Sequence, residues 1–210
     1  NITVDFQVDE SLGCLLRANG ISCPVKIDVR DYDYMMPLGS ICRWVSYVDS
    51  APYISSPAAS LSGPKELNIG LVWSGSPSHT NNRHRSCPVG YFKFLASLGN
   101  VYSLNPGAKD VPTWAKSLDL PNWTQTACAL EAMDFVVCVD TSVAHLAGAM
   151  GRPTFMLQPR KETDFRHGLP ITEKDTYQGN NIWYDSMTVI PNPNSWEKCI
   201  ENLKREIYAC

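Results

Sequence analysis

The chain has 210 residues, of which 44% are hydrophobic and 19% are charged. A chain of this length and composition can bury a sizeable core, which excludes an intrinsically disordered protein. Its formal net charge of -3 is not the basic excess of nucleic-acid or membrane-surface binders, so we expect no nucleic acid as a partner. No run approaches the ~20 apolar residues of a membrane span, so we expect no transmembrane segment.

The start of the sequence and its cysteines bear on the compartment. Asn1 is not followed by the basic and apolar regions of a signal peptide, and we expect either a removed start or a piece of a longer chain. The eight cysteines are irregularly spaced, contain no Cys-x-x-Cys pair and are not clustered with the four histidines. These observations predict a reduced, cytoplasmic protein without a metal site.

The first 60 residues predict a short α/β segment. We expect a strand at residues 2–8 and a helix at residues 10–18, which ends at Asn19-Gly20 because both residues tolerate a left-handed backbone. A short strand and an irregular tail should follow. Residues 55–64 are small, polar and contain Pro and Gly, which predicts a linker.

From residue 67 onward, apolar strands alternate with helices of about ten residues, which predicts a parallel, doubly wound α/β sheet. The expected strands are 67–73, 101–104, 135–139 and 153–157. The expected helices are 89–98, 124–133 with Thr124 as N-cap, 141–150, and 195–208 with Ser195 as N-cap.

The segment that follows the strand at 135–139 is the most informative one. Asp140 ends the strand and Thr141-Ser142 begins a helix, so the helix N-terminus should lie at the carboxyl edge of the sheet, where such folds bind ligands. The free N–H groups of this helix N-terminus and the hydroxyls of Thr141 and Ser142 favour binding of an anion. His145 lies on the same helix face as Thr141. The small residues Ala144, Gly148 and Gly151 should let this helix lie close to the sheet. However, Asp-Thr-Ser is also an ordinary cap sequence, and His145 could be a hydrogen-bonded core residue.

Two further loops should open at the same edge of the sheet, and an aromatic pair could add to the ligand site. The loop at 73–86 contains Gly75, which allows close backbone approach, and Arg83 and Arg85, which could clamp phosphate oxygens. The loop at 158–167 contains Asp164, Arg166 and His167. A solvated polar surface explains either loop equally simply. The pair Trp183-Tyr184 could lie against a sugar or base, although core packing is the simpler explanation for Trp183.

These motifs together resemble glycosyltransferase family 9, which contains the ADP-heptose:lipopolysaccharide heptosyltransferases and relatives associated with tetratricopeptide repeats. The resemblance is carried first by the run from Asp134 to Pro153. It continues in the ordered motifs at residues 69–76, 83–86, 164–166, 183–187 and 195–196. Residues 34–40 and 51–53 resemble the repeat-associated branch. The similarity therefore extends over nearly the whole chain.

The resemblance implies a GT-B glycosyltransferase, inverting and metal-independent, that uses a nucleotide-diphosphate sugar as donor substrate and no cofactor. The donor would be ADP-, UDP- or GDP-linked, and the acceptor a glycan, protein or lipid. By resemblance, the diphosphate would be bound by Ser74, Gly75, Arg83, Arg85, Asp140, Thr141, Ser142 and His145. Asn105 and Asp110 would contact the ribose or base, with Lys109 replacing the usual acidic residue. Asp164 and Arg166 would be the candidate catalytic residues near the transferred sugar.

The resemblance also implies a division of the chain. Residues 63–210 would form the nucleotide-sugar-binding domain, and residues 1–62 the last part of an acceptor-side domain. The region that supplies the general base in the family would precede Asn1, and Asp5, Asp9 and Asp28 match no base motif. Two alternatives remain open: a catalytically silent nucleotide-sugar-binding or interaction module, or an enzyme whose acceptor half comes from another chain. A homo-oligomer is also compatible with this sequence.

Overall fold

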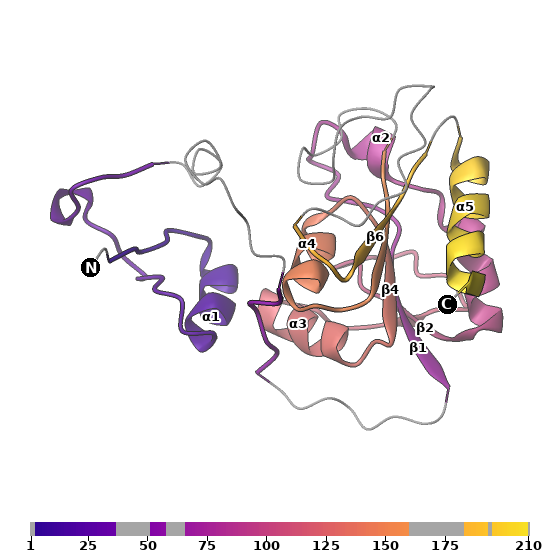
Figure 1. Cartoon of the computed structure of the whole chain (residues 1–210), viewed down its shortest axis with the longest axis horizontal. Coiled ribbons are helices and arrows are strands. Elements are labelled where there is room, and N and C mark those ends of the chain that lie inside the picture. The colour runs from indigo at the N-terminus through magenta and orange to yellow at the C-terminus, as the bar shows by residue number, and fades with distance from the viewer. Residues whose placement is uncertain (1–2, 37–50, 58–65, 160–182, 193–194, 210) are drawn as a thin grey trace.

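The structure is a computed structural model, which describes residues 3–36, 51–57, 66–159, 183–192 and 195–209. Its centre is a six-stranded parallel sheet in the order β3-β2-β1-β4-β5-β6 (Figure 1). The strands are β1 (Leu67–Val72), β2 (Gly99–Ser103), β3 (Lys116–Ser117), β4 (Phe135–Val139), β5 (Thr154–Leu157) and β6 (Met187–Ile190). The predicted parallel, doubly wound α/β fold is confirmed.

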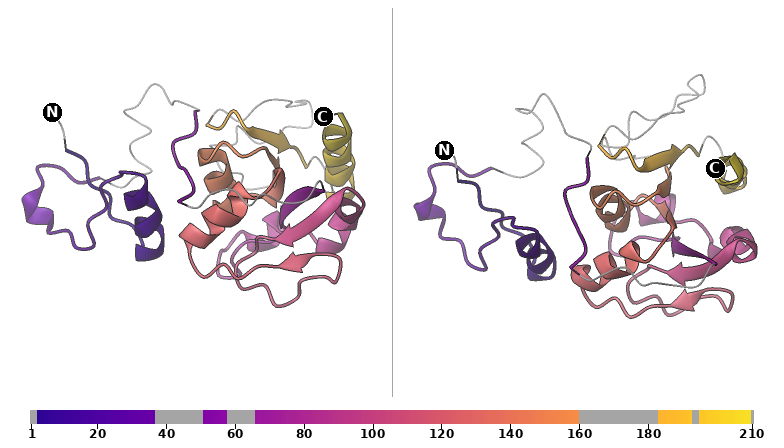
Figure 2. Two further views of the ribbon diagram at one scale, coloured as in Figure 1. Left: turned by 90° about the horizontal axis from the view of Figure 1, so that it is seen from below. Right: turned by 60° about the horizontal axis from the view of Figure 1, so that its bottom comes forward.

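Helices cover both faces of the sheet. α3 (Trp123–Glu131) and α4 (Ser142–Ala149) lie on one face, whereas the 3-10 helix η3 (Val89–Ser97) and α5 (Trp196–Ala209) lie on the other (Figures 1 and 2). The short helix α2 (Asn82–Arg85) follows the loop after β1. Because both faces are covered, strands such as β4 are apolar throughout instead of alternating with polar residues.

The two cores meet at the sheet and use alternate residues of each strand. In β4, Val136 and Cys138 belong to the core beneath α3 and α4, and Val137 and Val139 belong to the core beneath η3 and α5. All four side chains have no exposed surface. Each fully buried aliphatic side chain contributes about 1.5–3 kcal/mol relative to an exposed one, so the sheet holds a rigid frame for the loops at its edges.

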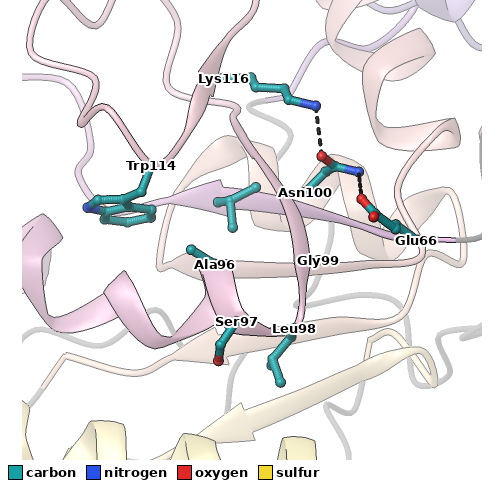
Figure 3. A pocket seen from close by; sticks show the side chains of 9 residues that line it. Glu66, Ala96, Ser97, Leu98, Gly99, Asn100, Trp114 and Lys116 are labelled. Carbon is teal, nitrogen blue, oxygen red and sulfur yellow. Dashed lines mark hydrogen bonds between the residues drawn. The ribbon is translucent and has the colours of Figure 1, made fainter.

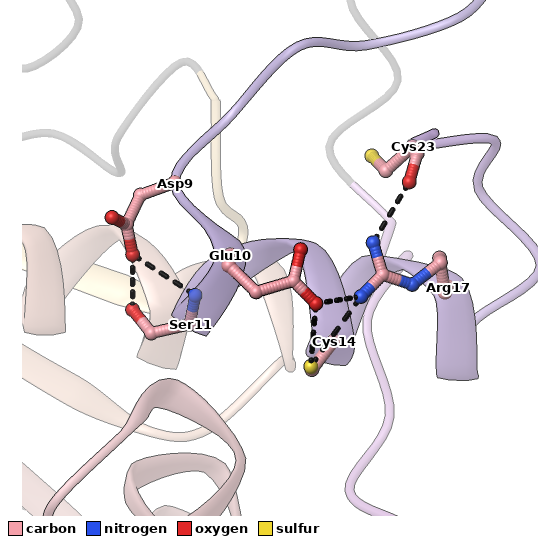
Figure 4. A network of polar contacts seen from close by, with 6 residues as sticks. All are labelled: Asp9, Glu10, Ser11, Cys14, Arg17 and Cys23. Atoms are coloured by element: carbon pink, nitrogen blue, oxygen red, sulfur yellow. Dashed lines mark hydrogen bonds and ion pairs between the residues drawn. The ribbon is translucent and has the colours of Figure 1, made fainter. Parts of the chain in front are cut away.

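The helix α1 (Glu10–Ala18) has the bounds that the sequence predicts. The carboxylate of Asp9 caps it by accepting a hydrogen bond from the Ser11 N–H at 2.9 Å (Figure 4). Arg17 pairs with Glu10 and donates to the carbonyl of Cys23 at 2.8 Å, which joins the helix to the segment after it. The stop at Asn19-Gly20 is confirmed, because Gly20 adopts a φ of 76°.

The N-terminal segment packs against α3 and α4. Leu15 of α1 is fully buried in the same core as these two helices. The Asn19 side chain accepts from the Ser55 N–H at 2.7 Å and donates to the Ser55 carbonyl at 3.1 Å. The backbone N–H groups of Tyr53 and Ile54 both donate to the carbonyl of Ala149 at the end of α4. Residues before the predicted linker are therefore fastened to the α/β sheet domain.

Two strands predicted near the N-terminus are wrong. The described residues 3–9 form no strand, and residues 21–36 contain the 3-10 helix η1 (Val29–Asp31) but no strand. The alternating sequence around Val4 and Phe6 suits a strand, but a strand requires a neighbour to pair with. Here Phe6 donates a single backbone hydrogen bond to Ser22. Of the predicted linker, residues 55–57 have no regular structure and the remainder lies outside the described residues.

Smaller corrections concern caps and short elements. Helix α3 is capped by Asn122, whose side chain accepts from the Gln125 N–H at 3.0 Å, and Thr124 is already inside the helix. The elements α2, β3 and β6 were not predicted. Ser195 precedes α5 and accepts from the Lys198 N–H at 3.4 Å, as its predicted role as N-cap requires.

Within the described ranges, no helix is long and apolar enough to cross a membrane.

Candidate functional site

The sheet reverses its strand order between β1 and β4, which pair directly, with Val72 opposite Cys138. In doubly wound sheets, the crevice beyond the carboxyl ends of the strands at such a reversal is the usual ligand site. The β1 loop begins here with Ser74 and Gly75, and the β4 strand passes into α4 through Asp140 and Thr141. Two of the segments predicted to share an edge therefore do share it.

Arg85 joins these two segments. Its Nη1 donates to the main-chain carbonyl of Asp140 at 3.0 Å. Its guanidinium also lies against Gly75, where a Cβ atom would be 2.4 Å from Nη2 and 2.6 Å from Cζ. The absence of a side chain at Gly75 thus makes room for the arginine, which gives the glycine a specific role at this position. The Arg85 Nε is buried and has no hydrogen-bond partner in the part of the chain that the structure describes.

Asn105, which follows β2, fixes the loop after β1 through hydrogen bonds of its side chain. Its Oδ1 accepts from the Trp73 N–H at 3.0 Å, and its Nδ2 donates to the Ser74 carbonyl at 2.6 Å and to the Ser74 hydroxyl at 3.1 Å. The side chain is only 8% exposed. Asn105 therefore fixes the loop backbone, while Asp110, the other predicted ribose-contacting residue, is exposed between β2 and β3.

The N-terminus of α4 presents the hydroxyls of Thr141 and Ser142. Thr141 is the N-cap residue, with an extended backbone, but its side chain makes no capping hydrogen bond. It is 6% exposed, and its Oγ1 is buried with no partner among the described residues. A buried hydroxyl without a partner costs about 1–3 kcal/mol, so its presence beside a positive helix end needs a reason. Ser142 is exposed next to it.

His145 is half-buried one turn further along α4 and contacts Tyr184, which precedes β6. Its Nδ1 lies 3.3 Å from the Tyr184 hydroxyl, and the two rings meet edge to face with their centroids 5.9 Å apart. Tyr184 also lies against Gly148, where a Cβ atom would be 2.4 Å from the tyrosine Cγ. Gly148 therefore gives room to this ring, and the predicted role in bringing α4 close to the sheet is wrong for this glycine.

The remaining predicted site residues lie elsewhere. Arg83 is exposed on α2, and its Nε donates to His84 at 3.0 Å, so the structure brings Arg85 and not Arg83 to the strand reversal. Asp164 and Arg166, the candidate catalytic residues, lie outside the described residues, as does His167.

The three N-terminal aspartates have local partners. Asp5 accepts from the hydroxyls of Ser22 and Tyr32, and these hydrogen bonds hold its pKa below the ordinary value. Hydrogen bonds from Ser11 lower the pKa of Asp9 in the same way. The Asp28 carboxylate pairs with the Arg30 guanidinium, which lowers its pKa as well. A lowered pKa makes a carboxylate a weaker base, so none of the three has the environment of a general base.

A pocket of about 450 Å³ lies at the opposite edge of the sheet, where β1 and β2 begin. Trp114 and the end of η3 form its wall (Figure 3). Its polar groups bond to one another: Lys116 donates to Asn100 at 2.7 Å, and Asn100 donates to Glu66 at 3.1 Å. This pocket is therefore separate from the groups gathered at the strand reversal.

Among the described residues, cysteine and metal-ion chemistry adds little to the site. The six cysteines within the described ranges are all free thiols. Burial raises the pKa of Cys138 and of Cys199, which keeps both thiols protonated and unreactive. Over the same ranges, no group of three His, Cys, Asp or Glu side chains could hold a metal ion.

Comparison with known proteins finds one family that part of the chain resembles. Residues 119–195 match the family model described as glycosyltransferase family 9 (heptosyltransferase). That segment contains α3, β4, α4, β5 and β6, together with Asp140, Thr141, His145 and Tyr184. Searches of curated proteins and of solved structures find no significant match. Residues 119–195 are thus similar to glycosyltransferase family 9, and they lie in an all-parallel α/β domain.

Proposed function

We propose that this chain binds the diphosphate of a nucleotide-sugar donor at the β1–β4 reversal, as the donor-binding half of a heptosyltransferase-like GT-B glycosyltransferase. The observation that carries the proposal is the Thr141 hydroxyl, which is buried without a described partner at the N-terminus of α4. A phosphate oxygen would satisfy both this donor and the positive end of the helix. The family 9 match over residues 119–195 supports the same assignment.

Several neighbouring groups would each contribute to binding of the diphosphate. Arg85, held by its bond to the Asp140 carbonyl, brings a permanent positive charge to the edge of the sheet. Ser74 and Gly75 offer loop backbone that Asn105 keeps in place. The exposed Ser142 and the half-buried His145 would add hydrogen-bond donors to those of the α4 N-terminus. A more distant Arg83 would add charge only after its side chain turns from His84.

The proposed reaction is inverting and metal-independent. An acceptor oxygen attacks the anomeric carbon as the bond from that carbon to the diphosphate breaks, and the acceptor proton passes to a base. Negative charge then develops on the leaving diphosphate, where Arg85, the α4 N-terminus and His145 stabilise it. Asp164 and Arg166 are the candidates nearest the sugar by resemblance. Asn105 and Asp110 are the candidates for the ribose or base.

The proposed domain division assigns donor binding to residues 63–210 and an acceptor-side role to residues 1–62. The burial of Leu15 in the core that contains α3, and the hydrogen bonds from the N–H groups of Tyr53 and Ile54 to the carbonyl of Ala149, support a fixed docking of the first segment on the second. The acceptor would be a glycan, protein or lipid.

Calorimetric titration with ADP, UDP, GDP and the matching nucleoside monophosphates tests the proposal. Diphosphates should bind at least several-fold more tightly than monophosphates, because the second phosphate meets Arg85 and α4. If no nucleotide binds, the proposal fails. A second assay then measures release of nucleotide from ADP-, UDP- and GDP-sugars. Binding without any release would favour a silent nucleotide-sugar-binding module over an enzyme.

A further inference from the structure

We infer that Tyr184 is a positioning residue for His145: its hydroxyl donates to Nδ1 and holds the imidazole in the tautomer that carries its proton on Nε2. The inference rests on the proposed function, in which His145 donates a hydrogen bond to the diphosphate. It adds to the site a residue that touches the histidine and not the nucleotide.

The contact between the two side chains has the required geometry. The Tyr184 hydroxyl lies 3.3 Å from His145 Nδ1, and the rings meet at an interplanar angle of 61°. A neutral imidazole has one donor nitrogen and one acceptor nitrogen, and the partner of one nitrogen decides where the proton is. When Nδ1 accepts the tyrosine proton, Nε2 is the protonated nitrogen.

Tyr184 is held in place, so its hydroxyl stays beside His145 Nδ1. Its side chain is 4% exposed, and its carbonyl accepts from the Met187 N–H at 3.1 Å at the start of β6. The ring also lies against the bare backbone of Gly148, about one helical turn after His145. The tyrosine therefore cannot turn away from the histidine without leaving the core.

The tautomer matters because of where His145 lies on α4. Side chains on a helix lean toward its N-terminus, so the imidazole leans toward the end at which Thr141 is found. An Nε2–H directed there adds a donor to those of the helix end. The other tautomer would direct a lone pair at an anion and repel it. Fixing the proton on Nε2 removes this unfavourable state before the ligand binds.

The test compares wild type, Tyr184→Phe and the matched control Tyr91→Phe. Tyr184→Phe keeps the ring that packs on Gly148 and removes only the hydroxyl. Tyr91→Phe removes a hydroxyl that bonds to Glu197 on the other face of the sheet. In ¹⁵N NMR of the ligand-free protein, wild type and Tyr91→Phe should show His145 protonated on Nε2, and Tyr184→Phe should show a mixture of tautomers. The Kd for ADP should rise roughly 5- to 10-fold in Tyr184→Phe only.

Two results would overturn the inference. One is a wild-type His145 protonated on Nδ1, which needs no variant to observe. The other is a folded Tyr184→Phe protein with the wild-type tautomer and an unchanged Kd. Because the NMR measurement needs no ligand, it separates the two proposals: a wild-type protein that shows the Nε2–H tautomer but binds no ADP contradicts the proposed function alone.

Discussion

The guanidinium of Arg85 donates to the main-chain carbonyl of Asp140 across 3.0 Å, and so connects the segment after β1 with the segment after β4. The two residues are 55 positions apart in the sequence. Their contact lies at the reversal of strand order, between the two loops that the proposed diphosphate site requires. This bond holds a permanent charge beside the N-terminus of α4.

Replacement of Arg85 by alanine should raise the Kd for ADP about 10- to 100-fold, because a charged hydrogen bond contributes ~1.5–3 kcal/mol. Arg30→Ala is the matched control, since the Arg30 side chain is 85% exposed and pairs with Asp28 in the N-terminal segment. Calorimetry on both variants checks the prediction. Equal affinities for the two variants would remove Arg85 from the site.

Replacement of Gly148 by alanine should lower the free energy of unfolding by about 1–3 kcal/mol, because the new Cβ would overlap the Tyr184 ring. The neighbouring atoms are two ring carbons and the Cβ of Tyr184 in a packed core, and they cannot easily give way. Gly90→Ala is the matched control: nothing lies within 4 Å of its added Cβ. Urea denaturation measures both. A Gly148→Ala protein as stable as Gly90→Ala would show that Tyr184 is not fixed against α4.

Stability should fall as the pH rises above about 9, in part because of Cys87. Burial, with a smaller effect of the Glu197 carboxylate, raises the pKa of this thiol from 9.0 to about 12. Below pH 9 the thiol is protonated in both the folded and the unfolded chain. Between pH 9 and 12 only the unfolded chain releases the proton, so unfolding becomes more favourable.

Urea midpoints measured from pH 8 to pH 10.5 for wild type and Cys87→Ala check this. The two proteins are compared by the slope of their stability with pH, whatever their overall stability, and this slope should be shallower without the thiol. Parallel curves for the two proteins would show that the Cys87 proton is not linked to folding.

The central strand and its helix could be predicted from sequence because several local signals agree there. The run at Phe135–Val139 is wholly apolar, and Asp140-Thr141-Ser142 marks the start of a helix. Parallel strands share a carboxyl edge, and this rule alone placed the Arg85 segment beside Asp140. Neither inference needed a contact between specific side chains.

Contacts between distant residues could not be predicted in this way. Tyr184 lies 39 positions after His145, and no spacing rule relates them. The sequence suggested a role for Gly148 against the sheet, whereas its real neighbour is the Tyr184 ring. Similarly, the alternation of apolar and polar residues around Val4 is typical of a strand. A strand also needs a neighbouring strand to pair with, and a local pattern does not reveal whether one is present.

The most direct test of the account is calorimetric titration of ADP into wild type and Thr141→Val, with urea denaturation of both. Valine keeps the shape of the side chain and its extended backbone, and it removes a hydroxyl that caps nothing and is buried without a described partner. The account predicts a Kd for ADP raised roughly 5- to 10-fold or more, with stability unchanged or increased. An unchanged Kd, or a loss of stability with ADP binding intact, would contradict it.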